Sequence, residues 1–353
     1  MTGPVELDKI NSVFYVYEIR SHGPTIKYYG EPQVDSKTLY QALWSEFYGK
    51  DYNIELKREH GEFVLTARPT REDKDKKAVH LILVVFTALT VMVTGAYLFY
   101  DVNPLANPFL VYKGIPFAIA VMFVLGSHEL AHYFVAKRRG MKASLPFFIP
   151  LPFISPIGTL GALIKLKGAI PDRKSLFDVG IAGPLVGLAA AVVVTVIGLL
   201  LPPIATSQPH GQTIVIGVPI LFALIAKIVP STSSAIHPIA FAGWVGMLIT
   251  SLNLLPVGQL DGGHIARALS GEKTAYISAA VPPLLMATGV YYSLNGLNGE
   301  TLMFWGFFAL LFAAGGHPQP INDTKRLDAK RLILGIIAFG LCVACFTPMP
   351  LQA

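Results

Sequence analysis

Charged residues are scarce in this chain. Only 14% of the 353 residues are Asp, Glu, Lys or Arg, whereas soluble domains usually contain about 25%. Hydrophobic residues make up 53% of the sequence, and the mean hydropathy is +0.53. A composition this poor in charge excludes an ordinary soluble globular protein and indicates one that crosses a membrane several times.

Cysteine is nearly absent as well. Cys342 and Cys345 both lie in the last apolar stretch. A C-x-x-C pair can serve redox or metal chemistry, but no other ligand is in register with this one, so we interpret it as two small side chains on a lipid-embedded helix. The acid-rich N-terminus has no apolar run, so we expect neither a secretory signal nor a typical transit peptide there.

The few charges are distributed unevenly. Residues 1–77 hold 12 of the 28 Lys and Arg residues and 13 of the 22 Asp and Glu residues, which leaves 16 and 9 for the remaining 276 residues. The chain therefore divides into a small, nearly neutral soluble segment and a large membrane segment with basic loops. We interpret the net charge of +6 as an orientation signal and expect no nucleic-acid partner.

The N-terminal segment mixes strand and helix patterns. Val13–Tyr17 and Phe63–Ala67 have the composition of strands. Ser36–Tyr48 carries apolar residues at helical spacing, with Ser36 in the cap position. Residues 1–77 are therefore predicted to form a small soluble α+β domain that ends in a charged linker at Arg71–Lys77.

The rest of the chain contains about seven apolar runs, and a full span needs about 20 residues. They lie at 78–100, 115–137, 177–201, 236–256, 274–295, 300–315 and 332–350. The run at 214–230 is short and carries Lys227, so we interpret it as re-entrant or interfacial. The predicted fold is an all-α polytopic transmembrane bundle of about six to seven spans, with a core at 78–270 and C-terminal transmembrane helices at 271–353.

Loop charges predict the orientation, because Lys and Arg concentrate on the cytoplasmic side of a membrane. If the N-terminal domain is cytoplasmic, the basic loops all fall on that side, at 74–77, 137–142, 173–174, 267–273 and 325–331. The opposite loops hold Asp101, Lys113, Glu300 and little other charge. We expect an integral, multi-pass protein of the plasma membrane.

A loop between Met141 and Lys174 has its own pattern. Four prolines at 146, 150, 152 and 156 rule out a long helix. Residues 158–168 then have a strand or hairpin pattern, with Leu163 and Lys165 on one face and Ile164 and Leu166 on the other. This segment predicts a short membrane-associated β-hairpin, although a plain connector would fit the prolines equally well.

The second span contains the residues that carry chemistry, His128-Glu129-Leu130-Ala131-His132. Two histidines four residues apart share one face of a helix and can hold one metal ion. The adjacent Glu129 lies where it can act as a general base. Ionisable side chains inside a membrane span are costly and usually functional. The motif therefore favours metal-dependent hydrolysis within the membrane.

A catalytic zinc site needs a third protein ligand. Asp261 stands out among the remaining acids, because Pro256 and the glycines at 258, 262 and 263 would break the helix beside it. Taken alone, Asp261 would be a helix cap. Because the same chain carries an intramembrane H-E-x-x-H motif, we interpret Asp261 as a metal ligand instead.

The two motifs together resemble the site-2 protease family of intramembrane zinc metalloproteases. That family pairs H-E-x-x-H on one helix with an N-P-x-x-x-L-D-G type signature on a later helix. Here the second signature is the variant Asn253-Leu254-Leu255-Pro256 followed by Leu260-Asp261-Gly262, in which Asn and Pro are not adjacent. The likeness covers roughly residues 78–270, and Ala182-Gly183-Pro184 also resembles the family.

The resemblance implies a site and a substrate. His128, His132 and Asp261 would hold a zinc ion (Zn²⁺), Glu129 would be the general base, and Asn253 would orient the substrate or stabilise the oxyanion. His264 is interpreted as a structural histidine. The partners would be a single-span transmembrane protein substrate and membrane lipid; no signal for an oligomeric state is present.

A transmembrane substrate must unwind before it is cut, and exposed backbone in lipid is costly. An edge strand can replace the lost hydrogen bonds, and the segment at 158–168 is our candidate, with Leu163, Ile164, Lys165 and Leu166 as substrate-binding residues.

Three other functions stay open at this point. The prenyl-protein processing class would take a downstream glutamate as ligand, but Glu272 and Glu300 lie in no second metal motif. A metal transporter or sensor would need polar groups across the bilayer, and these occur on one side only. A catalytically inactive scaffold would not need Glu129.

Overall fold

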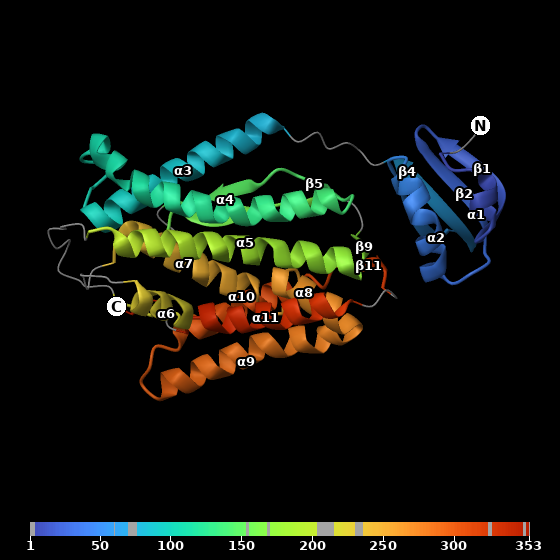
Figure 1. The fold of residues 1–353 in the computed structure, drawn as a ribbon. Helices are drawn as coiled ribbons and strands as arrows, with labels where there is room; N and C mark the ends of the chain where they lie inside the picture. Colours follow the sequence, from blue (N-terminus) through green and yellow to red (C-terminus); the bar gives the residue numbers. More distant parts are fainter. Residues whose placement is uncertain are drawn as a thin grey trace. The chain divides into compact units, whose positions relative to one another are not determined.

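The chain folds into two compact units (Figure 1). The computed structural model describes residues 4–59, 61–69, 76–152, 155–167, 170–202, 215–229, 236–323, 327–348 and 351–352. The first unit comprises Met1–Asp75, Gly168–Asp172 and Gln319–Lys325. The second comprises Lys76–Lys167, Arg173–Pro318 and Arg326–Ala353. Most of the predicted charged linker, residues 71–75, lies outside the described residues.

The first unit is built on a four-stranded antiparallel sheet of order β1-β2-β4-β3. Its elements are α1 Leu7–Asn11, β1 Phe14–His22, β2 Thr25–Pro32, α2 Ser36–Tyr48, β3 Tyr52–Glu59 and β4 Glu62–Pro69. The helix pattern at 36–48 is confirmed, but the cap is Asp35. Its carboxylate accepts a hydrogen bond from the Thr38 backbone N–H at 3.2 Å, which satisfies an otherwise free donor of the first turn.

The core of this unit lies between α2 and the sheet. Leu39, Leu43 and Phe47 recur every four residues and are fully buried, so they form one stripe of the helix. They pack with Phe14, Tyr28 and Leu65 from the strands. The strand at Ile170–Asp172 (β9) pairs in parallel with Pro320–Asn322 (β11), and both are counted with this unit.

The second unit is mainly helical. Its α-helices are α3 Lys77–Tyr100, α4 Ile115–Arg138, α5 Arg173–Leu200, α6 Ile220–Ile228, α7 Pro238–Asn253, α8 Asp261–Ser270, α9 Thr274–Leu294, α10 Glu300–Ala314 and α11 Ala329–Cys345. Two 3-10 helices, η1 Pro108–Gly114 and η2 Gly271–Lys273, precede α4 and α9. Each of the seven predicted apolar runs contains one of these α-helices.

Fewer of these helices than predicted qualify as spans. Among the described residues, four helical stretches are long and apolar enough to cross a membrane, at Lys77–Tyr100, Pro108–Arg138, Arg173–Leu200 and Asp261–Leu294. Helices α7 and α10 are apolar but shorter, and α11 has 17 residues. The prediction of a polytopic helical bundle is confirmed in this coarser form, and the count of six to seven spans is not. The run at 214–230 yields the nine-residue helix α6, which is too short to span.

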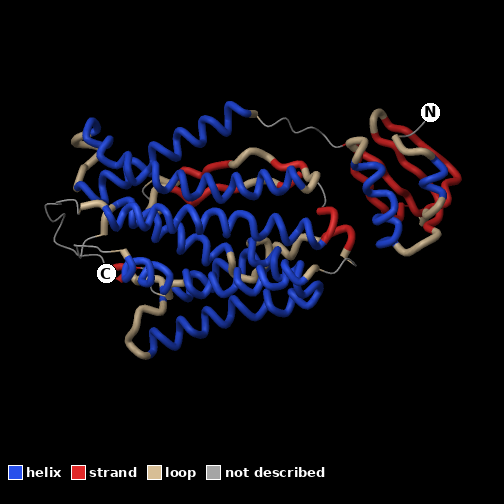
Figure 2. Tube along the Cα trace, in the orientation of Figure 1, coloured by secondary structure: helices blue, strands red, loops and turns tan. Residues whose placement is uncertain are grey.

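Short strands accompany the helices (Figure 2). They are β5 Lys142–Ala143, β6 Phe147–Pro150, β7 Thr159–Leu163, β8 Leu166–Lys167, β10 Val215–Ile216 and β12 Leu351–Gln352. The segment at 158–168 does contain strands, as expected. However, β7 pairs with β6 and β8 pairs with β5, so the partners lie upstream in the proline-rich loop.

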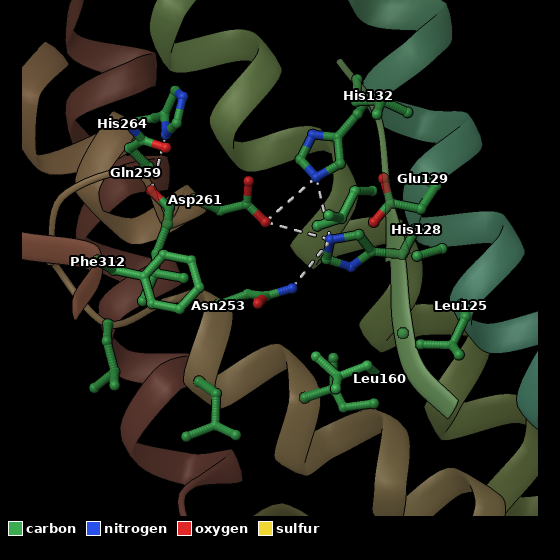
Figure 3. Close-up of a pocket in the computed structure, with 18 of the residues that line it drawn as sticks. Leu125, His128, Glu129, His132, Leu160, Asn253, Gln259, Asp261, His264 and Phe312 are labelled. Carbon is green, nitrogen blue, oxygen red and sulfur yellow. Dashed lines mark hydrogen bonds and ion pairs between the residues drawn. The ribbon is translucent and has the colours of Figure 1, made fainter. Parts of the chain in front are cut away.

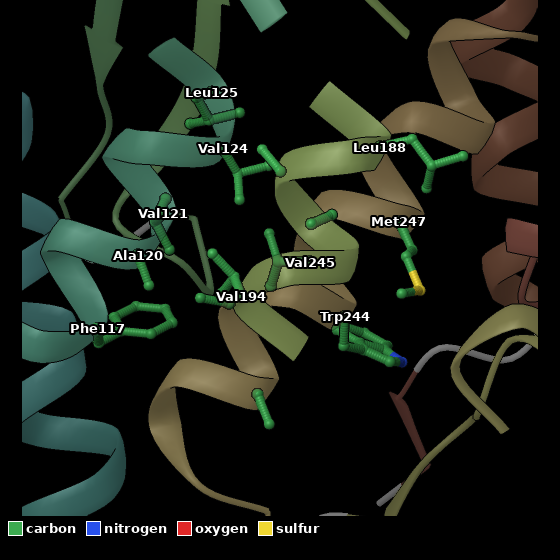
Figure 4. Close-up of a cluster of buried hydrophobic side chains, with 14 of the residues drawn as sticks. Phe117, Ala120, Val121, Val124, Leu125, Leu188, Val194, Trp244, Val245 and Met247 are labelled. Carbon is green, nitrogen blue, oxygen red and sulfur yellow. The ribbon is translucent and has the colours of Figure 1, made fainter. Parts of the chain in front are cut away.

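Helices α4, α5 and α7 pack around a shared apolar core (Figure 4). Phe117, Val121 and Val124 from α4 meet residues of α5 and α7, among them Val194, Trp244 and Met247. The backbones come close because small residues lie at the crossings: a Cβ on Gly198 would lie 2.1 Å from the Ala240 nitrogen. Close backbone approach at glycines is a typical packing solution for helices in membranes.

The starts of α5 and α11 are joined by ion pairs around Asp178. Its carboxylate accepts hydrogen bonds from Arg331 Nε and Nη2 at 2.7 and 2.8 Å, and it also pairs with Arg139, just past the end of α4. Arg331 in turn pairs with Asp328, the N-cap of α11. The Asp178 side chain is only 19% exposed, so this network holds three helices together under weak solvent screening.

Replacing Asp178 by Asn should therefore destabilise the second unit. The change leaves two guanidinium groups without their shared carboxylate, and we expect a loss of about 1–2 kcal/mol. Thermal unfolding in detergent, followed by circular dichroism, measures it. Lys174→Gln is the matched control, because Lys174 makes only a long, 3.7 Å pair with Asp328 and both side chains are more than a third exposed. If both variants unfold alike, the network does not contribute as described.

Candidate metal centre

Helix α4 brings the H-E-x-x-H side chains to one place. His128 and His132 are separated by one helical turn, and their ring centroids lie 4.8 Å apart. They are each 4% exposed, and Glu129 between them is 7% exposed. A carboxylate and two imidazoles buried this deeply need partners, because an unpaired polar group in an apolar interior is costly.

Asp261 reaches the same place from a break between two helices. Helix α7 ends at Asn253 and α8 begins at Asp261, so a loop around Pro256 separates the two helices, as the sequence predicted. The first turn of α8 lies against that loop. A Cβ on Gly262 would lie 2.1 Å from the Leu254 carbonyl oxygen, and one on Gly263 would lie 2.3 Å from that of Gly258. The two glycines after Asp261 are therefore required for its placement.

Three donor atoms converge in this centre (Figure 3). His128 Nε2 and His132 Nε2 are 3.1 Å apart, and each lies 3.3 Å from Asp261 Oδ2. Around a zinc ion with bonds of about 2.0–2.1 Å, tetrahedral ligands are separated by about 3.3–3.4 Å. The spacing of the donors and their chemistry, two imidazoles and one carboxylate, therefore fit a single tetrahedral metal ion.

The surrounding backbone orients these donors. The His132 Nδ1–H donates to the carbonyl oxygen of Val179 at 2.8 Å, which leaves Nε2 with its lone pair free for a metal. A second partner that fixes the tautomer of a ligand histidine is common in metal sites. Asp261 is the first residue of α8, where the helix dipole favours a negative charge.

The floor of the centre consists of glycines on α5. A Cβ on Gly183 would lie 2.1 Å from His132 Nε2, and one on Gly187 would lie 2.8 Å from His128 Nδ1. Glycines on membrane helices commonly serve close helix packing. Here they also make room for the two imidazoles, and the signal was available: 183 and 187 have the same four-residue spacing as 128 and 132.

The other predicted residues lie around the three donors. Asn253 Nδ2 is 3.4 Å from His128 Nε2, so its amide faces the centre from the end of α7. Glu129 lines the pocket around these donors, as does Ile164. His264 lines the same pocket, but its Nδ1–H donates to the Leu260 carbonyl at 2.8 Å within its own helix.

These residues line a pocket with a volume of about 330 Å³. One wall is β7 and the residue after it, from Leu160 to Ile164, followed by Leu166. Of the predicted substrate-binding residues, Leu163, Ile164 and Leu166 therefore reach the pocket, whereas the exposed Lys165 does not line it.

Helix α10 forms a wall that sequence reasoning missed, made of Trp305, Phe308 and Phe312. The sequence contained a signal for this wall, because these aromatic residues are three and four positions apart and therefore share one face of a helix.

The chain matches a known family over this region. The model of peptidase family M50 matches residues 116–294, just over half of the chain, and this range contains both motifs. The chain belongs to this family, the family of the site-2 proteases, and the resemblance stated from the motifs is confirmed. It is an integral membrane protein.

Curated relatives carry related names. A protein of Oryza sativa subsp. japonica, "Probable zinc metalloprotease EGY1, chloroplastic", is 31% identical over 250 residues, which is 67% of this chain and 41% of the relative. The Arabidopsis thaliana "Probable zinc metalloprotease EGY2, chloroplastic" is 32% identical over 251 residues, 68% of this chain and 43% of the relative. The chain thus spans less than half the length of these relatives. No solved structure matches it significantly.

The glycine floor can be tested by adding one methyl group. Gly183→Ala places a Cβ against His132 Nε2 and should displace that donor, so the purified variant should hold at least tenfold less zinc than the wild type. Gly340→Ala on α11 is the control, because nothing lies within 4 Å of the added Cβ. Metal content by atomic emission decides, and full zinc occupancy in Gly183→Ala would show that the glycine is not needed there.

Proposed function

We propose that this chain is an intramembrane zinc endopeptidase that hydrolyses peptide bonds within or near transmembrane segments of membrane-protein substrates. The observation that carries the proposal is the convergence of His128, His132 and Asp261 at 3.1–3.3 Å, with Glu129 beside them. The names of the curated relatives, zinc metalloproteases, support it.

His128, His132 and Asp261 are the residues that would hold the metal. When bound, zinc polarises a carbonyl group as a Lewis acid and lowers the pKa of water towards about 7. Three protein donors leave one position of a tetrahedron open, which is the composition of a catalytic rather than a structural zinc site.

Glu129 has the position of a general base. Its carboxylate lies in the pocket beside the metal ligands, where it takes the proton of the attacking water and then passes it to the leaving amide nitrogen. The Asn253 amide, 3.4 Å from His128 Nε2, supports a role as donor to the developing oxyanion or to the substrate.

Strand β7 is the candidate for substrate binding. It pairs with β6 along one edge, and no strand among the described residues pairs with its other edge. An unwound substrate segment can form backbone hydrogen bonds along that edge, which offsets the cost of exposed backbone in lipid. Leu163, Ile164 and Leu166 line the pocket there, and Lys165 extends beyond it.

The substrate class and the location complete the proposal. We infer a single-span membrane protein as substrate, in contact with lipid. We also infer a cytoplasmic side for the N-terminal unit, because the predicted topology puts the basic loops on the same side as this unit and Lys and Arg concentrate on the cytoplasmic side. The proposed organisation is a soluble α+β domain with its linker at residues 1–77, a metalloprotease core at 78–270 and C-terminal transmembrane helices at 271–353. The plasma membrane has no support from the relatives, which are named chloroplastic.

The alternative, a metal transporter or sensor without protease activity, is not favoured. It offers no reason for Glu129 beside the ligands or for a substrate-sized pocket whose walls are mainly leucine, isoleucine and aromatic side chains.

The base assignment predicts the outcome of one substitution. Glu129→Gln removes the proton acceptor and keeps the shape, so cleavage of a single-span test substrate should fall by at least 10³-fold while zinc content stays that of the wild type. The assay uses purified protein in detergent and detects fragments by mass spectrometry. Glu300→Gln, at the exposed start of α10, is the matched control and should keep full activity.

Two results would contradict the proposal. Full cleavage by Glu129→Gln would exclude this residue as the base. A wild type that binds zinc and cuts none of several single-span substrates would remove the protease assignment and bring the transporter or sensor forward.

A further inference from the structure

Helix α3 contacts the active-site hairpin by polar groups as well as by packing. We define this hairpin as β6 and β7, Phe147–Pro150 and Thr159–Leu163, with the described residues between them. The helix packs along β6, and two of its side chains, His80 and Thr90, donate hydrogen bonds at or next to the hairpin. Neither residue belongs to a motif of the metal centre, and both are at least 94% buried.

The first contact lies at the turn of the hairpin. The Thr90 hydroxyl donates to the Gly158 carbonyl oxygen at 2.8 Å, one residue before β7, and shares its proton with the Thr87 carbonyl oxygen of its own helix at 2.9 Å. Gly158 has a φ of +79°, and a Cβ there would lie 2.7 Å from the Thr90 carbonyl oxygen. The turn thus approaches α3 so closely that only glycine fits, and the threonine hydroxyl binds it there.

The second contact lies at the open end of the hairpin. His80 Nδ1–H donates to the Pro146 carbonyl oxygen at 3.0 Å, one residue before β6. The His80 ring also packs on Phe147, with centroids 4.0 Å apart. Phe147 is paired with Leu163, the last residue of β7. This contact therefore lies at the end of β7 that is followed by Ile164, which lines the pocket together with Glu129.

The two contacts bracket the hairpin. Ten residues of α-helix span about 15 Å, and a four-residue strand such as β6 spans about 13 Å. An isolated two-stranded hairpin is only marginally stable, so its position depends on what holds its ends. Here a single rigid helix holds both.

We propose that His80 and Thr90 are positioning residues that fix β7 against the metal centre, so that α3 determines which substrate bond faces Glu129. The inference rests on the proposed function, because it takes β7 as the substrate-binding strand. Loss of either contact loosens β7 without touching the metal ligands. Substrate binding and the choice of bond then change, whereas zinc binding does not.

The test compares three threonine substitutions on α3. Thr90→Val keeps the shape and removes the donor, and Thr90→Ser keeps the donor. Thr87→Val is the matched control, because the Thr87 hydroxyl is fully buried and has no hydrogen-bond partner among the described residues. A membrane hydrogen bond of typical strength corresponds to a change of about threefold to tenfold.

We expect Thr90→Val to raise KM for a single-span substrate by about threefold to tenfold with kcat changed less than twofold, and to cut at an additional neighbouring bond. Thr90→Ser and Thr87→Val should behave as the wild type, and all three should retain zinc. His80→Phe keeps the ring packing and loses the donor, so it should change KM and the cleavage position as Thr90→Val does. It replaces Thr90→Val in the test if that variant does not fold.

Amide hydrogen exchange of residues 159–164 provides a readout that needs no proteolysis. It should be faster in Thr90→Val and His80→Phe than in Thr87→Val. Unchanged exchange, KM and cleavage position in both variants would overturn the inference, and so would equal effects of Thr90→Val and Thr87→Val. If no variant and no wild-type protein cleaves a substrate, the proposed function fails, and the exchange rates still decide whether α3 positions β7.

Discussion

The convergence of one carboxylate and two imidazoles in an apolar interior is the constraint on which the rest of this structure depends. Each of these groups is expensive to bury alone, and the three are tolerable together because a cation can satisfy them all. His128 and His132 come from one helix, whereas Asp261 comes from the start of another. Holding these donors within 3.3 Å requires close packing of the elements around them. Glycines allow it on α5, beside the histidines, and at the start of α8, beside Asp261.

Helix α5 is the platform for this packing. Gly183 and Gly187 receive the two imidazoles, and the Val179 carbonyl sets the orientation of His132. Next to Val179, Asp178 ties the start of α5 to Arg139 and Arg331. At the same end, the Arg173 guanidinium donates to the carbonyls of Ala268 and Leu269 at the end of α8, the helix that begins with Asp261. One helix therefore touches every element that supplies a donor.

A strand beside the metal centre of a membrane protein is the second unusual feature, and the proposed function gives it a role. Backbone groups in lipid must be satisfied within the protein. Strand β7 is paired with β6 on one edge, and under the proposed function its other edge would pair with an unwound substrate. Helix α3 donates hydrogen bonds near both ends of this hairpin, through His80 and Thr90. The proposed catalytic residues and the proposed substrate-binding strand thus lie on separate elements, α4 and β7, which both line the pocket of the metal centre.

The amino-acid sequence by itself determined the membrane class, the helices and the identities of the chemical groups. Composition, apolar runs and the short-range spacing of His128, Glu129 and His132 are local properties, since helical periodicity alone places both histidines on one face. The sequence also predicted the helix break before Asp261 and a strand near 158–168.

Only the tertiary structure decided the rest. The pairing of β7 with β6, the part of Gly183 and Gly187 in the metal centre, and the aromatic wall of α10 all depend on contacts between distant segments. Periodicity states which face of an element is apolar or small, but it does not state which other element will cover that face.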